Sequence, residues 1–313
     1  MLFGLNWVAP HLIRERRNCL SILIYHRVLE APDYLRPNEP TAADFDWQMA
    51  LIARHFNPLP LSEAVDRLRA GTLPPRAVCV TFDDGYADNL EVAGPILTKW
   101  GVPATLYVAT GFLNGGMMWN DTIIETVRMA SGDSIDCCDL GLGLLPIRLA
   151  SDKCAALEKI ITAVKHLPPD QRQSQVDKLC GERANLPTDL MLTDQQLKTA
   201  AHSIFEIGAH TVSHPILVSL SDGEAEQEIA KGRDYLQRLL GTPITQFAYP
   251  HGRYGIDFDD RHANMVRTMG FSAAVATDHG VNFETSDYFQ LKRFTPWDKS
   301  AVKFYLRLLL SRK

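Results

Sequence analysis

The sequence predicts an α/β fold built on a parallel sheet, and two observations support it. Short apolar runs alternate with amphipathic segments of helix length over much of the 313-residue chain, which is the pattern of successive β/α units. Each polar motif that suggests chemistry follows directly after one of the apolar runs. Because the loops that leave the carboxyl ends of the strands build the active site in α/β barrels, these motifs are expected to meet on one face.

The predicted elements alternate between strand and helix. Strands are expected at residues 21–25, 77–82, 104–108, 205–208, 246–249 and 272–276. Helices are expected at residues 42–55, 61–70, 89–100, 222–240 and 260–269. Capping boxes at Ser221 and Thr193 mark two helix starts, while Gly101 and Gly241 mark two helix ends.

The segment from about residue 117 to residue 192 interrupts this alternation. Its best periodic stretches, residues 123–129 and 154–166, are predicted to be helices, with no clear strand between them. We therefore expect a helical insertion, about 117–192, within a single domain that spans residues 1–313.

The C-terminal segment, residues 301–313, combines apolar and basic side chains. This pattern fits a helix that lies on a membrane surface, but it is more common in a final helix packed on the body of a domain. A weak membrane-surface contact by this helix is kept as an alternative.

The composition is that of a folded globular protein, with 46% hydrophobic residues and a formal net charge of -5. Without a basic stripe, nucleic acid is not expected as a partner. The six cysteines form no CxxC pair, which argues against structural zinc. No run is long enough to span a membrane, and residues 1–10 lack the pattern of a secretory signal peptide, so a cytoplasmic location is expected.

The run Thr81-Phe82-Asp83-Asp84-Gly85 places two adjacent carboxylates at the end of a predicted buried strand. Such groups repel each other and lose hydration there, so the pair is expected to serve a metal, a proton or both. Taken alone, the run also fits a strand-end turn with an N-capping aspartate, or the magnesium site of a phosphoryl-transfer enzyme.

The run His210-Thr211-Val212-Ser213-His214-Pro215 offers two imidazoles four positions apart. With one aspartate of the earlier pair, they supply the three protein ligands of a mononuclear catalytic metal site, and the other aspartate is free to act as general base. Two histidines at this spacing also arise by chance, and Thr211 stands where the HExxH zinc-protease motif has its glutamate. The two runs together are much more specific than either alone.

These runs resemble the first and second motifs of the polysaccharide deacetylases, the NodB-homology group of carbohydrate esterases (carbohydrate esterase family four). The resemblance extends to Tyr25-His26-Arg27-Val28 and to Phe247-Ala248-Tyr249-Pro250-His251-Gly252, and it covers roughly residues 22–294 outside the insertion. It implies a distorted (β/α) barrel, a divalent metal, and hydrolysis of an N-acetyl or O-acetyl group on a sugar. Zinc is the favoured metal, with other divalent transition metals as alternatives.

The resemblance also implies roles for individual residues. Asp83 would be the general base, and Asp84, His210 and His214 would be the metal ligands. A backbone amide at His251 would bind the oxyanion of the tetrahedral intermediate, a contribution that is typically worth ~3 kcal/mol.

Three further residues are assigned to substrate binding. Tyr249 and Pro250 belong to the third motif of the family. Trp119, at the start of the insertion beside Asp121, offers a ring on which a sugar can stack, although an ordinary helix N-terminus explains these two residues equally well.

Two positions depart from the family pattern. Ala248 stands where the family has an arginine that braces the general base, so either Arg253 or Arg293 takes that role or the brace is missing. Leu291-Lys292-Arg293 stands where the family has a Leu-x-His motif that carries the general acid.

The general acid must then be sought elsewhere. The candidates are His26, His251 and His279, since imidazoles titrate near neutral pH. His26 is favoured because it directly follows the first predicted strand, and a hydrogen-bonded structural histidine is the alternative for each.

The sequence therefore predicts a metal-dependent hydrolase of amide bonds. Its substrate is expected to be an acetylated sugar polymer, oligomer or lipid-linked precursor, as in exopolysaccharide biosynthesis. One alternative, suggested by the two departures, is a carbohydrate-binding pseudoenzyme that has lost turnover. Another is an amide hydrolase of the same fold that acts on a non-sugar substrate.

Overall fold

The parallel strands of the protein form a nearly closed barrel. The computed structural model describes residues 19–165, 167–181 and 186–310. The parallel strands follow one another in the order β1 (Cys19–Tyr25), β3 (Ala77–Phe82), β4 (Ala104–Val108), β7 (Phe205–Ala209), β8 (Gln246–Ala248), β9 (Ala273–His279) and β11 (Leu291–Arg293). The sheet curls until Leu23 of β1 pairs with Phe294, directly after β11. The predicted fold class is confirmed.

Three short strands of the main sheet escaped prediction. β2 (Asn57–Pro58) pairs with β3, and β10 (Asn282–Phe283) runs antiparallel to β1 at the edge of the sheet. β11 is the third, and only one of its three side chains is apolar. Strands of two or three residues are too short to produce a recognisable alternation of apolar and polar positions.

The predicted helices all form around the barrel. They are α2 (Ala42–His55), α3 (Leu61–Arg69), α4 (Gly94–Trp100), α9 (Asp222–Leu240) and α10 (Asp260–Thr268). A further helix, α8 (Asp194–Ala201), begins at the helix start predicted at Thr193. The first five residues of the helix predicted at 89–100 form a π-helical turn, η2 (Asn89–Ala93). The capping boxes at Thr193 and Ser221 are present, and Gly101 and Gly241 adopt left-handed conformations with φ of 62° and 68° at the ends of α4 and α9.

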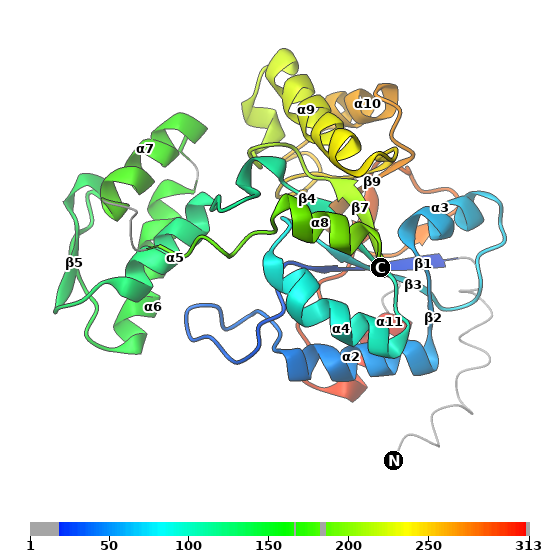
Figure 1. Cartoon of the computed structure of the whole chain (residues 1–313), viewed down its shortest axis with the longest axis horizontal. Helices are drawn as coiled ribbons and strands as arrows, with labels where there is room; N and C mark the ends of the chain where they lie inside the picture. Colours follow the sequence, from blue (N-terminus) through cyan, green and yellow to red (C-terminus); the bar gives the residue numbers. More distant parts are fainter. Residues whose placement is uncertain (1–18, 166, 182–185, 311–313) are drawn as a thin grey trace.

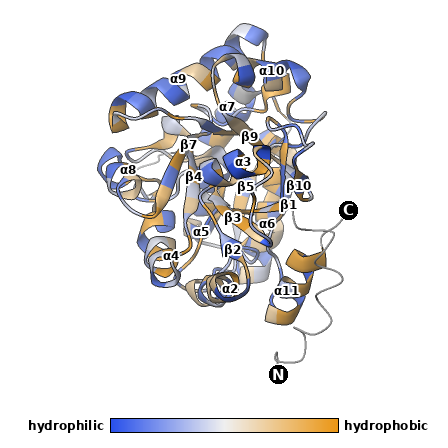
Figure 2. Ribbon diagram, turned by 90° about the vertical axis from the view of Figure 1, so that its right-hand side faces the viewer, coloured by the Kyte–Doolittle hydropathy of each residue, from blue (hydrophilic) through white to orange (hydrophobic). Residues whose placement is uncertain are grey.

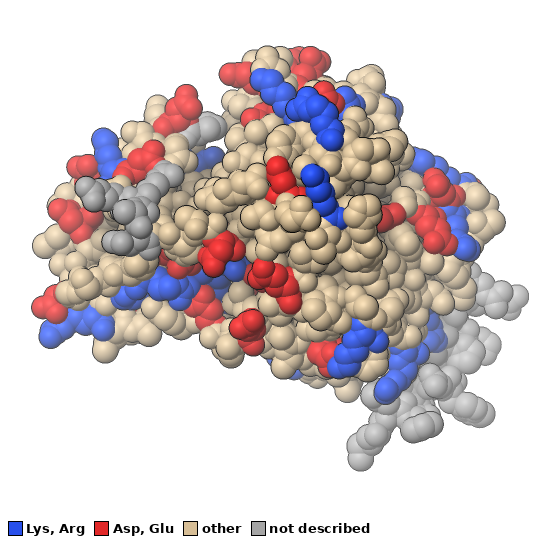
Figure 3. Space-filling model, viewed as in Figure 1, with Lys and Arg blue, Asp and Glu red and all other residues tan. Residues whose placement is uncertain are grey.

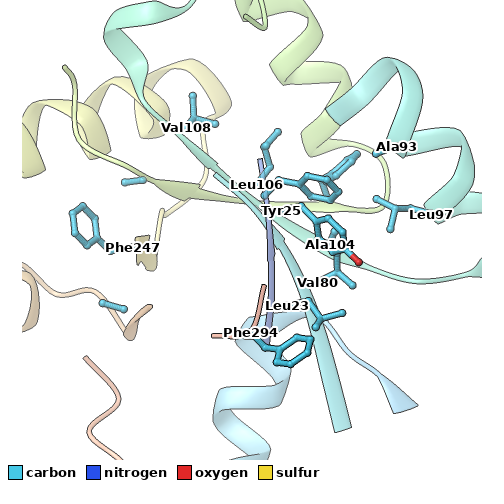
Figure 4. Packing of buried hydrophobic residues seen from close by; sticks show 14 of the residues in the cluster. Leu23, Tyr25, Val80, Ala93, Leu97, Ala104, Leu106, Val108, Phe247 and Phe294 are labelled. Atoms are coloured by element: carbon cyan, nitrogen blue, oxygen red, sulfur yellow. The ribbon is translucent and has the colours of Figure 1, made fainter. Parts of the chain in front are cut away.

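Side chains along each strand alternate between two apolar clusters. Leu23, Val80, Leu106 and Phe247 belong to the cluster between the sheet and the outer helices, several of whose members appear in Figure 4. Their neighbours Ile22, Cys79, Tyr107 and Ala248 belong to a second cluster, to which α3 contributes Leu61, Ala64, Val65 and Leu68. Each large apolar side chain that is fully buried in this way contributes about 1.5–3 kcal/mol. Because both faces of the sheet are packed, chemistry is confined to the ends of the strands and their loops.

The insertion forms a lobe beside the barrel (Figure 1). It contains α5 (Trp119–Met129), β5 (Ser134–Cys137), β6 (Gly143–Pro146), α6 (Ala150–Val164) and α7 (Pro169–Cys180), which surround an apolar cluster of their own. The expectation of no strand here was wrong, because β5 and β6 form an antiparallel hairpin. Most of the hairpin side chains are exposed or half-buried, so the sequence lacks the apolar alternation of a buried strand. The chain rejoins the barrel at Met191, which pairs with Tyr86.

The final helix, α11 (Ala301–Leu310), packs on the body of the domain. Phe304, Tyr305 and Leu308 are buried, and the ring centroids of Phe304 and Trp47 of α2 lie 5.6 Å apart. Figure 2 shows apolar segments along α11, and Val302 and Leu310 are exposed. Among the described helices, none combines the length and apolar character needed to cross a bilayer. Residues 1–10, on which the expected lack of a signal peptide rests, lie outside the described residues.

Candidate active site

The structure brings the predicted metal-binding residues together at the carboxyl ends of β3 and β7. The Oδ1 atom of Asp84 lies 3.4 Å from Nε2 of His210 and 3.4 Å from Nε2 of His214. One ligand atom from each residue can be chosen so that all three lie within 4.8 Å of one another. The Oδ1 atom of Asp84 is buried and has no hydrogen-bond partner. A buried carboxylate oxygen without a partner is costly, and a divalent cation between these three atoms would satisfy it.

Neighbouring groups set the orientation of the His210 imidazole and the protonation state of the His214 imidazole. Nδ1–H of His210 donates to the Ala248 carbonyl at 2.7 Å, which leaves Nε2 facing Asp84. Burial, which outweighs the opposing charge of Asp84 and is reinforced by the nearby His210 and His251, lowers the pKa of His214 to about 3. His214 is therefore neutral at physiological pH, which is the form of an imidazole that binds a metal.

The backbone is strained around these side chains. Asp84, Thr211, His214 and His251 have φ of 79°, 65°, 53° and 59°. This left-handed region disfavours residues with a Cβ atom, above all a β-branched threonine, at a cost of order 1–3 kcal/mol each. Thr211 and His214 are linked, since the His214 amide donates to Thr211 Oγ1 at 3.1 Å. Strain that gathers around one set of polar side chains is typical of a functional site.

Helix α9 fixes the loop that carries His214. The carboxylate of Glu228 accepts hydrogen bonds from the Val212 and Ser213 amides at 2.9 and 2.8 Å, and from Ser213 Oγ at 2.9 Å. Gly232 lies one turn further along α9. A Cβ atom at this position would lie 2.7 Å from the Thr211 carbonyl oxygen, so the close approach of α9 to the loop requires glycine at position 232. Sequence reasoning missed both residues, although a glycine in the middle of a helix was an available signal.

Arg293 braces the second aspartate. Its Nη1 and Nη2 atoms donate to Oδ1 and Oδ2 of Asp83, each at 2.7 Å, and its Nε donates to the Ala276 carbonyl at 2.8 Å. Arg253, the other candidate, pairs with Asp257 instead, at 3.3 Å. Burial acts to raise the pKa of Asp83, but the Arg293 guanidinium outweighs it and holds the pKa below its usual range. Asp83 is therefore ionised at neutral pH, as a general base must be.

The three candidate acids occupy different surroundings. His26 is half-buried after β1 and lines a cavity of about 320 Å³ with Asp84, Glu39 and Tyr86. The ring centroid of His251 lies 5.0 Å from that of His214, and its buried Nε2 atom has no hydrogen-bond partner. His279 is exposed, and its ring packs against Phe294. The cavity beside His26 is within the size range of small-molecule sites.

The third motif requires a correction. The Tyr249 side chain is fully buried, its ring stacks on Phe258 with centroids 3.7 Å apart, and its hydroxyl donates to the Phe289 carbonyl at 2.9 Å. Pro250 is buried as well. Tyr249 was assigned to substrate binding, and its burial contradicts a contact with substrate through the side chain, because this side chain is part of the core.

The start of α5 lies near the site. Trp119 is half-buried, and the Arg172 guanidinium carbon lies 4.9 Å from the centroid of its ring. Asp121 lines the cavity beside His26, but its carboxylate is bound by Arg36 at 2.9 Å and by the Tyr86 hydroxyl at 2.8 Å. Asp121 is thus held by the protein itself, whereas sugar stacking by Trp119 stays a prediction.

Known proteins share this fold and these motifs. A model of the polysaccharide deacetylase family matches residues 70–136 and 164–274. The putative polysaccharide deacetylase YxkH of Bacillus subtilis (strain 168) is 21% identical over 280 residues, which are 89% of this chain and 72% of that protein. Two solved structures are similar in fold. The Streptococcus pyogenes deacetylase PplD in complex with acetate has a TM-score of 0.63, with 20% identity over 93% of this chain and 98% of that one. The structure of IcaB from Ammonifex degensii has a TM-score of 0.61, with 20% identity over 95% of this chain and 98% of that one.

The extent of the family match decides the assignment. The matched residues make up more than half of the chain, and they include the two aspartates of the first motif and both histidines of the second. This protein therefore belongs to the polysaccharide deacetylase family of hydrolases, which act on amide bonds.

Proposed function

We propose that this protein is a metal-dependent deacetylase that removes an N-acetyl group from a sugar unit of a polysaccharide or of its precursor. One observation carries the proposal: the two adjacent aspartates have opposite surroundings. Asp84 points an unpartnered oxygen at two histidine nitrogens, whereas both oxygens of Asp83 are bound by Arg293. One carboxylate is thus suited to hold a cation and the other to stay ionised and accept a proton.

Asp84, His210 and His214 would hold the metal, and zinc is favoured because it binds imidazole and carboxylate ligands in sites that keep one position open. When bound, such an ion lowers the pKa of water and polarises a carbonyl oxygen. Asp83 would take the proton of the attacking water. Because Arg293 fixes both of its oxygens, the carboxylate needs little reorganisation during that step.

Two histidines would complete the reaction. The backbone N–H of His251 is proposed to stabilise the oxyanion of the tetrahedral intermediate. His26 is proposed to donate a proton to the leaving amine, because it lines the cavity that also contains Asp84.

Metal analysis paired with an assay of acetate release from N-acetylglucosamine oligomers tests the function. We expect about one divalent metal per chain and metal-dependent release of acetate. Stoichiometric metal without hydrolysis of any acetylated sugar or amide would favour the carbohydrate-binding pseudoenzyme. Hydrolysis of simple acetylated amides alone would favour the amide hydrolase with a non-sugar substrate.

Removing the His26 imidazole tests the general acid. His26→Ala is expected to lower kcat/KM by about 10²–10⁴-fold and to remove the basic limb of its pH profile, since a general acid must be protonated to act. His279→Ala is the matched control, because that exposed ring contacts Phe294 rather than the site. A basic limb that persists in His26→Ala would exclude His26 as the acid.

The hydrogen bonds between Glu228 and the loop that carries His214 offer a test of metal binding that does not depend on turnover. Glu228→Ala is expected to weaken metal affinity by about 10–100-fold, because the loop that presents His214 loses three hydrogen bonds. Competition with a chromophoric chelator measures this. Glu226→Ala, which removes an exposed carboxylate from the same helix, should leave the affinity unchanged. Equal affinities in the two variants would mean that Glu228 does not position His214.

The cellular setting is also proposed rather than observed. A cytoplasmic location would favour a lipid-linked or nucleotide-linked sugar over a finished polymer. Charged side chains of both signs are interspersed on the face seen in Figure 3, in keeping with the expectation that nucleic acid is not a partner. A weak membrane-surface contact through the exposed apolar residues of α11 stays a proposal.

A further inference from the structure

Arg172, on α7 of the insertion, is a buried cation that pairs with no carboxylate among the described residues. Its exposed fraction is 6%. The described part of the chain contains two other buried arginines that bind carboxylates: Arg36 pairs with Asp121 at 2.9 Å, and Arg293 pairs with Asp83 at 2.7 Å. Burying a charge without a partner is costly, so the unpaired state of Arg172 requires an explanation.

Among the described residues, one hydrogen bond engages the guanidinium of Arg172. Nη1 donates to the Lys165 carbonyl at 3.4 Å, and the guanidinium carbon lies 4.9 Å from the centroid of the Trp119 ring. A guanidinium has five N–H donors in a fixed planar arrangement that suits two oxygens of a carboxylate or phosphate. One long hydrogen bond to a carbonyl uses little of this capacity. A structural role at the α6–α7 turn therefore does not by itself account for a charged group here.

Arg172 lies on the catalytic side of the insertion. Its partner Trp119 begins α5, which the chain reaches from the carboxyl end of β4 through the η3 turn (Thr110–Phe112). In that turn the Gly111 amide donates to the Val212 carbonyl at 2.8 Å, so the connection is tied to the metal-binding loop.

The cation also lies near the third motif. Arg172 and Lys165 are close enough to His251 for their charges to act on its imidazole. The ring of His251 lies beside that of His214, with centroids 5.0 Å apart. The charges of two cations of the insertion thus act on a residue that contacts the metal-binding His214.

We propose that Arg172, assisted by Lys165, forms an anion-binding subsite, and that the acetylated sugar accepted by this protein carries a phosphate or carboxylate group. This inference rests on the proposed deacetylase function and narrows its substrate class. A neutral polymer offers nothing that would compensate a buried guanidinium, whereas an anion bound beside the reacting sugar would also fix the register of the substrate. The insertion would then select substrates by charge.

Substrates that differ in charge provide the test. N-acetylglucosamine 1-phosphate, N-acetylglucosaminuronic acid and the neutral N-acetylglucosamine disaccharide are compared in wild type, Arg172→Ala and Arg172→Lys. We expect the ratio of kcat/KM for the anionic over the neutral sugar to fall about tenfold or more in Arg172→Ala and less in Arg172→Lys. In wild type, this ratio is determined separately for the sugar phosphate and for the uronic acid. The larger of the two ratios shows whether the subsite prefers a phosphate or a carboxylate group. Lys178→Ala, which removes an exposed cation from the same helix, should keep the ratio.

The outcomes separate this inference from the function on which it rests. A purely structural Arg172 would lower kcat/KM for every substrate by the same factor, and an unchanged ratio would overturn the proposal. If wild type hydrolyses none of these sugars, calorimetric titration with the same compounds replaces the kinetic ratio. Tighter binding of the anionic sugars that disappears in Arg172→Ala would support the subsite even though deacetylation had failed. Equal binding of anionic and neutral sugars would overturn it.

Discussion

Asp84→Ala is expected to abolish both metal binding and acetate release, whereas Asp83→Asn is expected to retain the metal and to lose about 100-fold or more in kcat. The reason is the difference in their surroundings: Asp84 faces two imidazole nitrogens, while Asp83 is bound by Arg293. Metal content is measured by elemental analysis after dialysis, and kcat by acetate release at saturating metal. The opposite pattern of metal retention would exchange the roles of the two aspartates.

The pair of variants carries its own control for folding. Asp84→Ala removes a carboxylate whose Oδ1 has no hydrogen-bond partner, so its far-UV circular dichroism should match that of the wild type. Asp83→Asn leaves Arg293 without its anion and should unfold at a lower denaturant concentration. If Asp84→Ala lost both the metal and the folded circular dichroism spectrum, the loss of metal would reflect unfolding. That result would contradict the expectation that Asp84→Ala folds and lacks only a metal ligand.

The sequence predicts most of the barrel because long buried strands leave a clear pattern. The strands at 77–82 and 104–108 were placed at the residues where they occur, since each is apolar except for one threonine. The hairpin of β5 and β6 was missed because its side chains are mostly not buried. Tyr249 was misplaced for a related reason, since a motif shows which residues gather at a site but not which of their side chains turn into the core.

The brace of the general base shows where reasoning from one sequence ends. Arg293 and Arg253 were alternative candidates for this brace, and no predicted strand distinguished them. Only the pairing of Phe294 with Leu23 brings β11 beside β1 and so places Arg293 next to Asp83. That pairing joins residues about 270 positions apart, which no local pattern reveals.

The insertion is held to the barrel by buried charges, which bears on any subsite that it provides. Arg36, in the loop after β1, binds Asp121 at 2.9 Å and Glu125 at 2.8 Å, and both of these belong to α5. Burial lowers the pKa of Arg36, but the two carboxylates outweigh it, and its pKa lies above the usual range. Because these groups are paired and little exposed, the start of α5 is fixed relative to the loop that follows β1. Trp119 is carried by this fixed helix, and Arg172, on the neighbouring α7, lies over its ring, as a site that orients a substrate requires.

Arg293→Ala is expected to destabilise the metal-free protein by about 3–5 kcal/mol at neutral pH, because it leaves a buried carboxylate without its partner. Arg293 is 1% exposed, and its guanidinium also donates to the Ala276 carbonyl and to Thr81 Oγ1. Urea unfolding gives the free energy. Arg253→Ala, which removes an exposed arginine from a 3.3 Å pair with Asp257, is the matched control and should cost at most about 1 kcal/mol.

The pH dependence of this difference shows whether the charge of Asp83 causes it. In the wild type, the pKa of Asp83 is held below its ordinary value of 3.8, so the stability that pairing supplies is fully present above that pH and is lost only as pH falls through the depressed pKa. In Arg293→Ala, burial is no longer opposed by the guanidinium and should raise the pKa of Asp83. The variant then takes up a proton at a pH where the wild type does not, which relieves the buried charge. The difference in the free energy of unfolding should therefore shrink between pH 7 and pH 4.5, and the acidic limb of the kcat profile should move to higher pH. A difference that is the same at both pH values would mean that Arg293 stabilises the fold through packing rather than by holding Asp83 ionised.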